Sequence, residues 1–410
     1  MWPLGLRQWL PLRGMVQLQG FAESALFHAE RIVRGKVLRP LLKIQFNPDS
    51  ILMSSRKSFS FLLSPTLLMC AAGLPVYGSV PPGLSDMADS GASAASDAEA
   101  LMEAAGNDAE AMAEARKALN EAVVIEGSDG WLFGLNDVRH HAAGVFWGER
   151  AAEVAASSRN PDPLPAITAM AEQASQAGAK LIVMPVPSKV SAYPGKLDAG
   201  MEGWTDEARA GFVEELKNAG VGIVDITALL AELREQGELS HLQTDAHWSP
   251  QAVEKVAAHL YEMVKDEEWV QALDRAEVSM EESTVTRTGD LADQIGADQE
   301  TFSVNRVSLD GERVSRDDNS PIVLMGDSHG LVYGHRDLLT TQAGLGDHLA
   351  AQFGVPLDVT SVMGSGANAS RMALARRGDS LEGKKLLIWV FAERELSRSG
   401  SGWPVIPVVR

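Results

Sequence analysis

Ser328 has the sequence setting of a serine nucleophile. It lies in Gly326-Asp327-Ser328-His329-Gly330, directly after the apolar run 321–325. Glycines beside a serine at a strand-to-helix turn let the chain bend sharply and leave the hydroxyl exposed. A serine hydroxyl is a poor nucleophile on its own, so this chemistry requires a base nearby.

The base is predicted in the segment 244–250, Thr-Asp-Ala-His-Trp-Ser-Pro. Asp245 and His247 are two positions apart, so an extended or turning loop can place both side chains on one side. Asp245 would then accept the Nδ1 proton of His247, while Nε2 faces Ser328. Ser249 and Pro250 fit the N-cap and first position of a following helix. The alternative is that these are surface polar residues before a helix cap.

A metal site is a second way to use the same region. Asp245, His247, Asp327 and His329 offer oxygen and nitrogen ligands that could activate a water molecule. No further histidine or carboxylate stands at an obvious ligand spacing, and Ser328 would have no task. We therefore favour the serine chemistry, with no metal.

The elements that must position these residues predict an α/β fold. Apolar runs separated by helical patterns favour a doubly wound, mainly parallel sheet with helices on both faces. Strands are expected at 180–185, 221–226, 321–325, 357–362 and 385–391. Helices are expected near 164–177, 204–218, 249–265, 337–353 and 369–377. Residues 267–318 are expected to be an irregular, charged insertion with some short strands.

Ligands of such sheets bind beyond the carboxyl ends of the strands, so the loops there supply further candidates. Lys189, with Tyr193, is expected to bind an anionic substrate group. Gly364, Gly366 and Asn368 are expected to form an oxyanion hole from backbone N–H groups and the Asn368 amide. Arg394 is expected to be either a substrate clamp or part of an ion pair. We expect no role for His140, His141 and His241.

Composition excludes some classes of partner and site. The 410-residue chain has a net charge of -19, and residues 58–410 hold 27 basic against 52 acidic side chains. So acidic a body repels phosphate backbones, which argues against nucleic acid as a partner. Cys70 is the only cysteine, so the chain has no internal disulfide and no zinc site built on cysteines.

The N-terminal part predicts export. Residues 53–78 have basic residues, then a mostly apolar stretch and small residues, the layout of a signal peptide or an uncleaved anchor. Residues 1–52 are interpreted as a mis-annotated or extra leader. Residues 79–119 are expected to form an acidic linker and one helix, starting at about Ser96, and residues 120–410 the catalytic domain.

The motifs together resemble the alginate O-acetyltransferase family of the AlgJ/AlgX type. They are the segments 127–133, 185–189 with Tyr193-Pro194, 244–249 and 326–328, in that order. The family has an SGNH-hydrolase-like domain in which the Asp-x-His pair precedes the serine, and this chain has that order. The end of the chain at Arg410 looks more like the single-domain AlgJ type.

The resemblance implies a periplasmic enzyme without a cofactor. It would take an acetyl group from a membrane-bound donor protein of the MBOAT type and place it on hydroxyls of an exopolysaccharide. Ser328 would be the acyl-accepting nucleophile, His247 the base and Asp245 its orienting acid, with an acetyl-serine intermediate. The acidic body suits a uronate polymer such as alginate poorly, so a neutral acceptor such as cellulose is an alternative.

Two other functions fit the same residues. A carbohydrate acetylesterase would use the same triad and resolve the acyl-enzyme with water. A non-catalytic polysaccharide-assembly protein would keep the fold, although a complete Asp245, His247 and Ser328 set argues against it.

Overall fold

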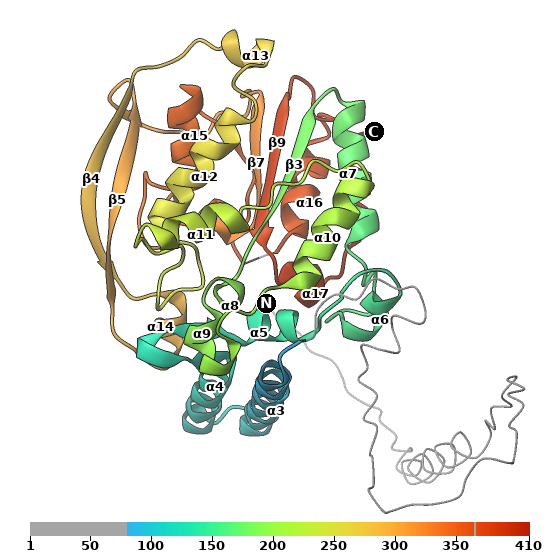
Figure 1. The fold of residues 1–410 in the computed structure, drawn as a ribbon, viewed down its shortest axis with the longest axis vertical. Coiled ribbons are helices and arrows are strands. Elements are labelled where there is room, and N and C mark those ends of the chain that lie inside the picture. The colour runs from blue at the N-terminus through green and yellow to red at the C-terminus, as the bar shows by residue number, and fades with distance from the viewer. Residues whose placement is uncertain (1–79, 365) are drawn as a thin grey trace, which may run out of the picture. The chain divides into compact units, whose positions relative to one another are not determined.

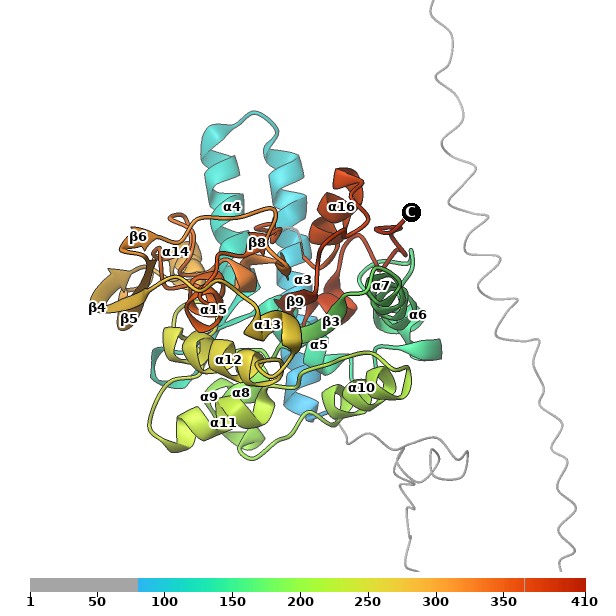
Figure 2. The ribbon, with the colours of Figure 1, turned by 90° about the horizontal axis from the view of Figure 1, so that it is seen from above.

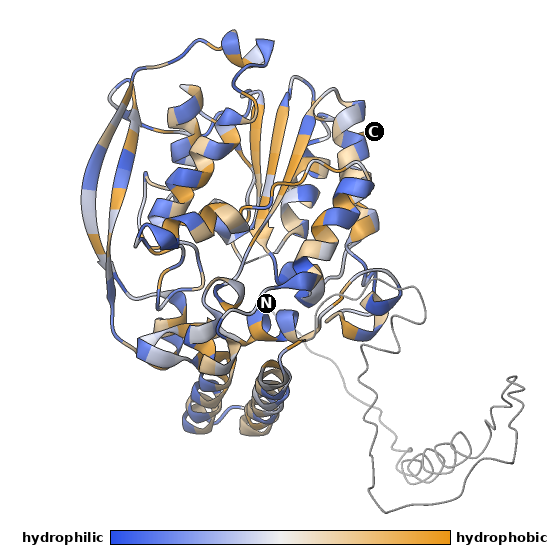
Figure 3. Ribbon diagram, viewed as in Figure 1, coloured by the Kyte–Doolittle hydropathy of each residue, from blue (hydrophilic) through white to orange (hydrophobic). Residues whose placement is uncertain are grey.

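A four-stranded parallel sheet lies at the centre of the computed structural model, which describes residues 80–364 and 366–410. Its strand order is β3-β9-β7-β8, and every neighbouring pair is parallel. The strands are β3 (Lys180–Val186), β7 (Ile322–Gly326), β8 (Asp358–Val359) and β9 (Leu386–Ala392). β3, β7 and β9 are apolar almost throughout, as burial on both faces requires, and Figure 3 shows them in orange.

Helices pack on both faces of this sheet (Figure 1). Successive side chains of a strand point to opposite faces, so Ile182 and Met184 of β3 join one core cluster while Leu181 and Val183 join the other. The first face is covered by α11 (Thr227–Glu235), α12 (Pro250–Glu262) and α15 (Leu345–Phe353). The second is covered by α7 (Leu164–Gln176), α10 (Glu207–Asn218) and α16 (Asn368–Arg377).

Short helices occupy many of the connections. The α-helices among them are α5 (Leu135–Ala142), α6 (Ala151–Val154), α8 (Lys189–Ala192), α9 (Pro194–Leu197), α13 (Glu268–Gln271), α14 (Asp290–Ile295) and α17 (Glu395–Arg398). The 3₁₀ turns are η1 (Ser128–Gly130), η2 (Gly148–Arg150), η3 (Ala199–Met201) and η4 (Ser328–Gly330). A two-stranded sheet pairs β1 (Val124–Glu126) with β2 (Leu132–Gly134).

The segment 267–318 is more regular than expected. It contains the antiparallel ribbon β4 (Val278–Arg287) and β5 (Glu300–Leu309), paired over ten residues, with β6 (Glu312–Arg313) beside β5. In Figure 1 the ribbon lies at the far left, beyond α12 and α15. Most β4 side chains are exposed, so this strand lacks the apolar alternation by which a strand is usually predicted.

In the described part of the chain, two helices rather than one precede the β1 strand. They are α3 (Pro82–Ala105) and α4 (Ala109–Val123), which lie side by side in Figures 1 and 2. The predicted start near Ser96 was wrong, because Leu84 and Ala88 of the first turns are buried in a cluster with Trp131. Contacts with distant residues therefore extend the helix beyond its Ala/Glu-rich part.

Three other predicted elements are shorter in the structure. The strand expected at 357–362 is limited to the two residues of β8. The helix expected near 337–353 begins only at Leu345, because Leu339 and Gln342 have left-handed backbone angles, φ 68° and 66°. The strand expected at 221–226 contributes a single bridge, between Ile223 and Val183 of β3. The leader and signal predictions for residues 1–78 lie outside the described residues. Among the residues that are described, no helix combines the length and the apolar character needed to span a membrane.

Candidate active site

The turn that carries Ser328 is fixed between β7 and β9. Gly326 has φ 144°, and a Cβ at this position would overlap the carbonyl oxygen of Val390 on the neighbouring strand. Asp327 then anchors the turn: its carboxylate accepts the N–H of His329 at 2.9 Å and that of Ala392 at 2.8 Å. The buried Asp327 carboxylate thus connects the end of β7 to the end of the neighbouring strand, β9. Ser328 follows at the first position of η4.

The Asp245–His247 loop is held in place by two helical caps. Ser249 is the N-cap of α12, with its hydroxyl accepting the Ala252 N–H, and Pro250 occupies the first helical position. On the other side, the N–H of Asp290 at the start of α14 donates to Asp245 Oδ2 over 2.8 Å. These contacts present the carboxylate and the imidazole on one side of the loop.

Asp245, His247 and Ser328 form a continuous hydrogen-bonded chain. His247 Nδ1 lies 2.6 Å from Asp245 Oδ1, and His247 Nε2 lies 2.8 Å from Ser328 Oγ. Asp245 and His247 are buried, whereas Ser328 is only half-buried. This is the arrangement of a nucleophile, a general base and an orienting carboxylate.

Burial and charge act in opposite directions on this pair. Burial by itself would raise the pKa of Asp245, but the adjacent His247 and the hydrogen bonds that the carboxylate accepts lower it to about 2. Burial likewise opposes a charge on His247, but the Asp245 carboxylate outweighs it and the pKa of His247 is raised. Asp245 therefore stays ionised at neutral pH and stabilises a protonated His247.

Ser328 and His247 line a cleft of about 540 Å³. Both basic and acidic side chains line it, together with Leu338, Leu339 and Met363. The charged lining residues are Arg287, Arg336, Arg394, Asp245, Asp290, Asp293 and Asp337. The cleft can thus admit a substrate with hydroxyl groups and an acyl group beside the serine.

Three of the predicted supporting residues have structural contacts that do not fit their expected roles. Lys189 is buried, and its Nζ donates to the carbonyl of Gln243 at 3.0 Å, so it does not offer a free cation to a polymer. The Tyr193 hydroxyl accepts the Ser240 N–H at 2.8 Å. The Asn368 amide donates to Ser401 and to a backbone carbonyl, each at 2.6 Å, which removes it from the expected oxyanion site.

The other predicted residues lie at or near the cleft. Gly364 lines it, with φ 67°, and Gly366, with φ 57°, packs against the Glu395 carboxylate. Arg394 also lines the cleft and pairs with Asp137 at 3.2 Å. Gly364 and Arg394 are therefore placed where they can contact a substrate.

The ring nitrogens of His247 argue against the metal alternative on geometric grounds. Both are engaged, one with Asp245 and the other with Ser328, so a metal ion would have to displace one of these partners. His329 lies beside His247, with ring centroids 4.8 Å apart, and its Nδ1 is 3.3 Å from Asp327. The four residues expected as metal ligands thus form two separate pairs, Asp245 with His247 and Asp327 with His329.

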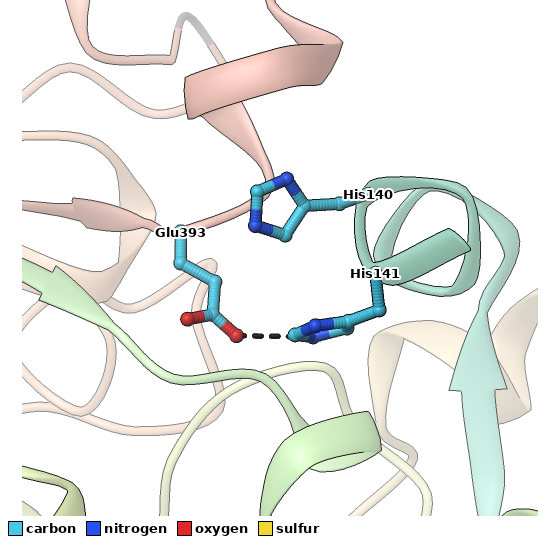
Figure 4. Close-up of side chains that lie close together, drawn as sticks. All are labelled: His140, His141 and Glu393. Carbon is cyan, nitrogen blue, oxygen red and sulfur yellow. Dashed lines mark ion pairs between the residues drawn. The ribbon is translucent and has the colours of Figure 1, made fainter. Parts of the chain in front are cut away.

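Two of the three histidines for which no role was expected, His140 and His141, form part of a buried charge cluster, shown in Figure 4. His141 contacts Asp206 through Nδ1 at 2.7 Å and Glu393 through Nε2 at 3.1 Å, while Arg209 pairs with the other Glu393 oxygen at 2.5 Å. Burial opposes a charge on His141, but these carboxylates raise its pKa to about 10; burial lowers the pKa of His140 to about 4. His141, Asp206, Arg209 and Glu393 thus form a network of buried ion pairs and hydrogen bonds.

This ion network also connects two strand ends next to the active site. Glu393 follows β9, and its Oε1 also accepts the N–H of Ser188, which follows β3, at 2.7 Å. The carboxyl ends of two neighbouring strands are thereby joined next to Arg394. Sequence spacing did not reveal this, because its members come from four segments spread over residues 141–393.

Residues 124–393 match the family described as "SGNH hydrolase-like domain, acetyltransferase AlgX". A curated relative, the "Probable alginate O-acetylase AlgJ" of Pseudomonas aeruginosa, is 26% identical over 138 residues, which are 33% of this chain and 32% of the relative. The chain thus matches about a third of that relative's length.

Two solved structures have a similar fold. The O-acetyltransferase domain of Pseudomonas putida AlgJ superposes with a TM-score of 0.51 at 20% identity, covering 67% of this chain and 92% of that one. Pseudomonas aeruginosa AlgX gives a TM-score of 0.50 at 16% identity, covering 68% of this chain and 65% of that one. At these identities the likeness concerns the fold.

Proposed function

The chain belongs to the SGNH hydrolase-like acetyltransferase family of the AlgX type, and from this premise we propose that it is a periplasmic polysaccharide O-acetyltransferase. It transfers acetyl groups through an acetyl-Ser328 intermediate onto hydroxyls of an exopolysaccharide, alginate or a similar polymer. The observation that carries the proposal is the hydrogen-bonded chain from Asp245 through His247 to Ser328, which opens into the cleft.

The first half-reaction forms the acyl-enzyme. His247 Nε2 takes the proton of Ser328 Oγ as this oxygen attacks the acetyl carbonyl of the donor and forms a new C–O bond. The first residue of a helical turn has a backbone N–H without an acceptor inside that turn, so Ser328 N–H can stabilise the oxyanion, and Gly364 lines the same cleft. Collapse breaks the bond to the donor's leaving group, which receives the proton from His247.

The second half-reaction reverses these roles. A sugar hydroxyl gives its proton to His247 and attacks the acetyl-serine carbonyl. Collapse breaks the bond between the acetyl group and Ser328 Oγ, which regains its proton from His247. The acetyl donor for the first half would be a membrane-bound protein of the MBOAT type, as periplasmic transfer needs acetyl groups delivered across the membrane.

The charge of the cleft bears on the polymer. Three arginines lie among four aspartates there, although the chain as a whole carries a charge of -19. The arginines therefore offset the repulsion between an acidic polymer and the acidic chain, and a neutral polymer can form hydrogen bonds with the same side chains. Both kinds of polymer belong in the acceptor panel.

A donor–acceptor assay tests the proposal. The purified protein is given a chromogenic acetyl ester and oligosaccharides of mannuronate, guluronate and cellulose, and acetate and acetylated sugar are measured by mass spectrometry. We expect acetylated sugar with the parent and with the exposed control Ser279→Ala, but none with Ser328→Ala. Acetate alone would indicate an esterase. Equal activity of Ser328→Ala would overturn the nucleophile, and no activity with any acceptor would favour a non-catalytic protein.

A further inference from the structure

The segment 289–300, which follows β4 and ends with the first residue of β5, holds the loop that carries Asp245. Ala292 N–H donates to the Thr244 carbonyl at 3.0 Å, and the Glu300 carboxylate accepts the N–H groups of Gln243 and Thr244, each at 2.9 Å. Gly289 packs so closely that a Cβ there would overlap the Thr244 carbonyl. The ribbon region is therefore a support of the active site.

Asp290 makes the contacts nearest to the chemistry. Its N–H donates to Asp245 Oδ2 at 2.8 Å, while its own Oδ1 accepts the Ala246 N–H at 2.6 Å. Asp290 is the donor in the first hydrogen bond and the acceptor in the second, so the two bonds together fix Asp290 against the loop. Asp245 Oδ1 remains for His247, which it contacts at 2.6 Å.

Asp290 is also a second carboxylate beside the base. Its Oδ2 lies 4.0 Å from His247 Nδ1, and its side chain is 44% exposed on the wall of the cleft. A carboxylate at this distance favours a positive charge on the imidazole, although solvent weakens the interaction. During transfer His247 is protonated, so Asp290 stabilises it at the stage when charge develops.

Charged and titratable groups face His247 from several elements. Asp245 lies on its own loop, Asp290 comes from α14, His329 from η4 and Arg394 from the end of β9. The Lys189 ammonium of α8 interacts electrostatically with the carboxylates of Asp245 and Asp290. Burial opposes a charge on His247, the two carboxylates raise its pKa, and Arg394 lowers it. Partial burial and Asp245 in turn raise the pKa of Asp290.

We propose that Asp290 is a positioning residue of this site, whose side chain holds the Asp245–His247 loop through the Ala246 N–H and supplies a second negative charge to the protonated His247. The inference rests on the proposed Ser328 chemistry. It assigns a positioning role to a residue outside the Ser–His–Asp set, in the segment expected to be an irregular insertion.

Two substitutions separate the two parts of this role. Asp290→Asn keeps an oxygen that can accept the Ala246 N–H but removes the charge, whereas Asp290→Ala removes both. Asp298→Asn is the matched control, because it makes the same change of charge at an exposed position that does not line the cleft. Thermal melting of each variant establishes that it is folded.

The readouts are kcat/KM for the chromogenic ester as a function of pH, and NMR titration of the His247 ring. We expect Asp290→Asn to lose about tenfold in kcat/KM and to shift the acidic limb and the NMR midpoint to lower pH. Asp290→Ala should lose about 100-fold, because the loop also moves. Asp298→Asn should match the parent.

Each departure from these results has a distinct meaning. If Asp290→Asn titrates as the parent does, the charge role is overturned, and if Asp290→Ala retains full kcat/KM, the positioning role is overturned. If the parent itself cleaves no ester, the proposed function fails, while the NMR midpoints of parent and Asp290→Asn still decide whether Asp290 acts on His247.

Discussion

His247 Nε2 lies 2.8 Å from Ser328 Oγ, although the two residues are 81 positions apart in the chain. The sheet explains this proximity, because Ser328 follows β7 while the His247 loop is held by α12 on one side and α14 on the other. A base in contact with a hydroxyl, and itself bonded to a buried carboxylate, predicts how substitutions and pH will act.

Asp245→Asn should lower kcat for ester cleavage by about 1,000- to 10,000-fold while leaving the fold intact. The amide is close in size to the carboxylate, but it cannot stabilise the protonated imidazole and can favour the wrong tautomer of His247. Stopped-flow or steady-state cleavage of the acetyl ester measures the loss, and Asp298→Asn serves as the control. A decrease below tenfold would mean that Asp245 does not orient the base.

The pH profile of kcat/KM should have an acidic limb whose midpoint lies above 6.5, the ordinary histidine value. Burial opposes protonation of His247, but Asp245 and Asp290 raise its pKa, and only the unprotonated base accepts the serine proton. Activity should therefore rise with pH through this midpoint. A limb at or below 6.5 would show that burial outweighs the carboxylates.

Much of the fold and the central site could be predicted from the sequence, because both depend on local patterns. Continuous apolar runs identified β3, β7 and β9, and the Gly-flanked Ser328 and the Asp245–His247 spacing lie together as expected. What these residues do remains a prediction until activity is measured. The alternation of apolar strand segments with helical patterns was the signal that predicted the fold.

The parts that sequence reasoning missed depend on long-range contacts. Asp290 faces His247 only because α14 packs on the loop, and nothing in the spacing of residues 245 and 290 indicates it. The exposed β4 strand showed no apolar alternation, and α3 is extended by packing against Trp131. Lys189 was misjudged because charge alone does not reveal that its ammonium is buried.

The buried ion network should make stability depend on pH in the alkaline range. The Asp206 and Glu393 carboxylates raise the pKa of His141 to about 10 against the effect of burial. A group with a raised pKa stabilises the fold fully below its unfolded value of 6.5, and this contribution is lost as pH rises through about 10. The melting temperature should therefore fall between pH 7 and pH 10.

His141→Gln tests the origin of that decrease. The variant should be less stable at pH 7, by about 3–5 kcal/mol, because it leaves the buried Asp206 without its cation and Glu393 with Arg209 alone. It should also lose the part of the pH dependence that His141 causes. The exposed His335→Gln is the control and should follow the parent. Parallel melting curves of parent and His141→Gln from pH 7 to pH 10 would contradict this account.

Gly326→Ala should destabilise the protein by about 2–4 kcal/mol and abolish most of the activity of what remains folded. At φ 144° an alanine is strained, and its Cβ would overlap the Val390 carbonyl, so β7 and β9 would have to separate where Asp327 bridges them. Gly311→Ala is the matched control: it too has a positive φ, 75°, but open space around it, and should cost about 1–2 kcal/mol. Urea unfolding followed by circular dichroism gives both free energies. Equal losses in the two variants would show that close packing under the nucleophile turn adds nothing beyond backbone strain, and that Ser328 does not depend on this contact for its position.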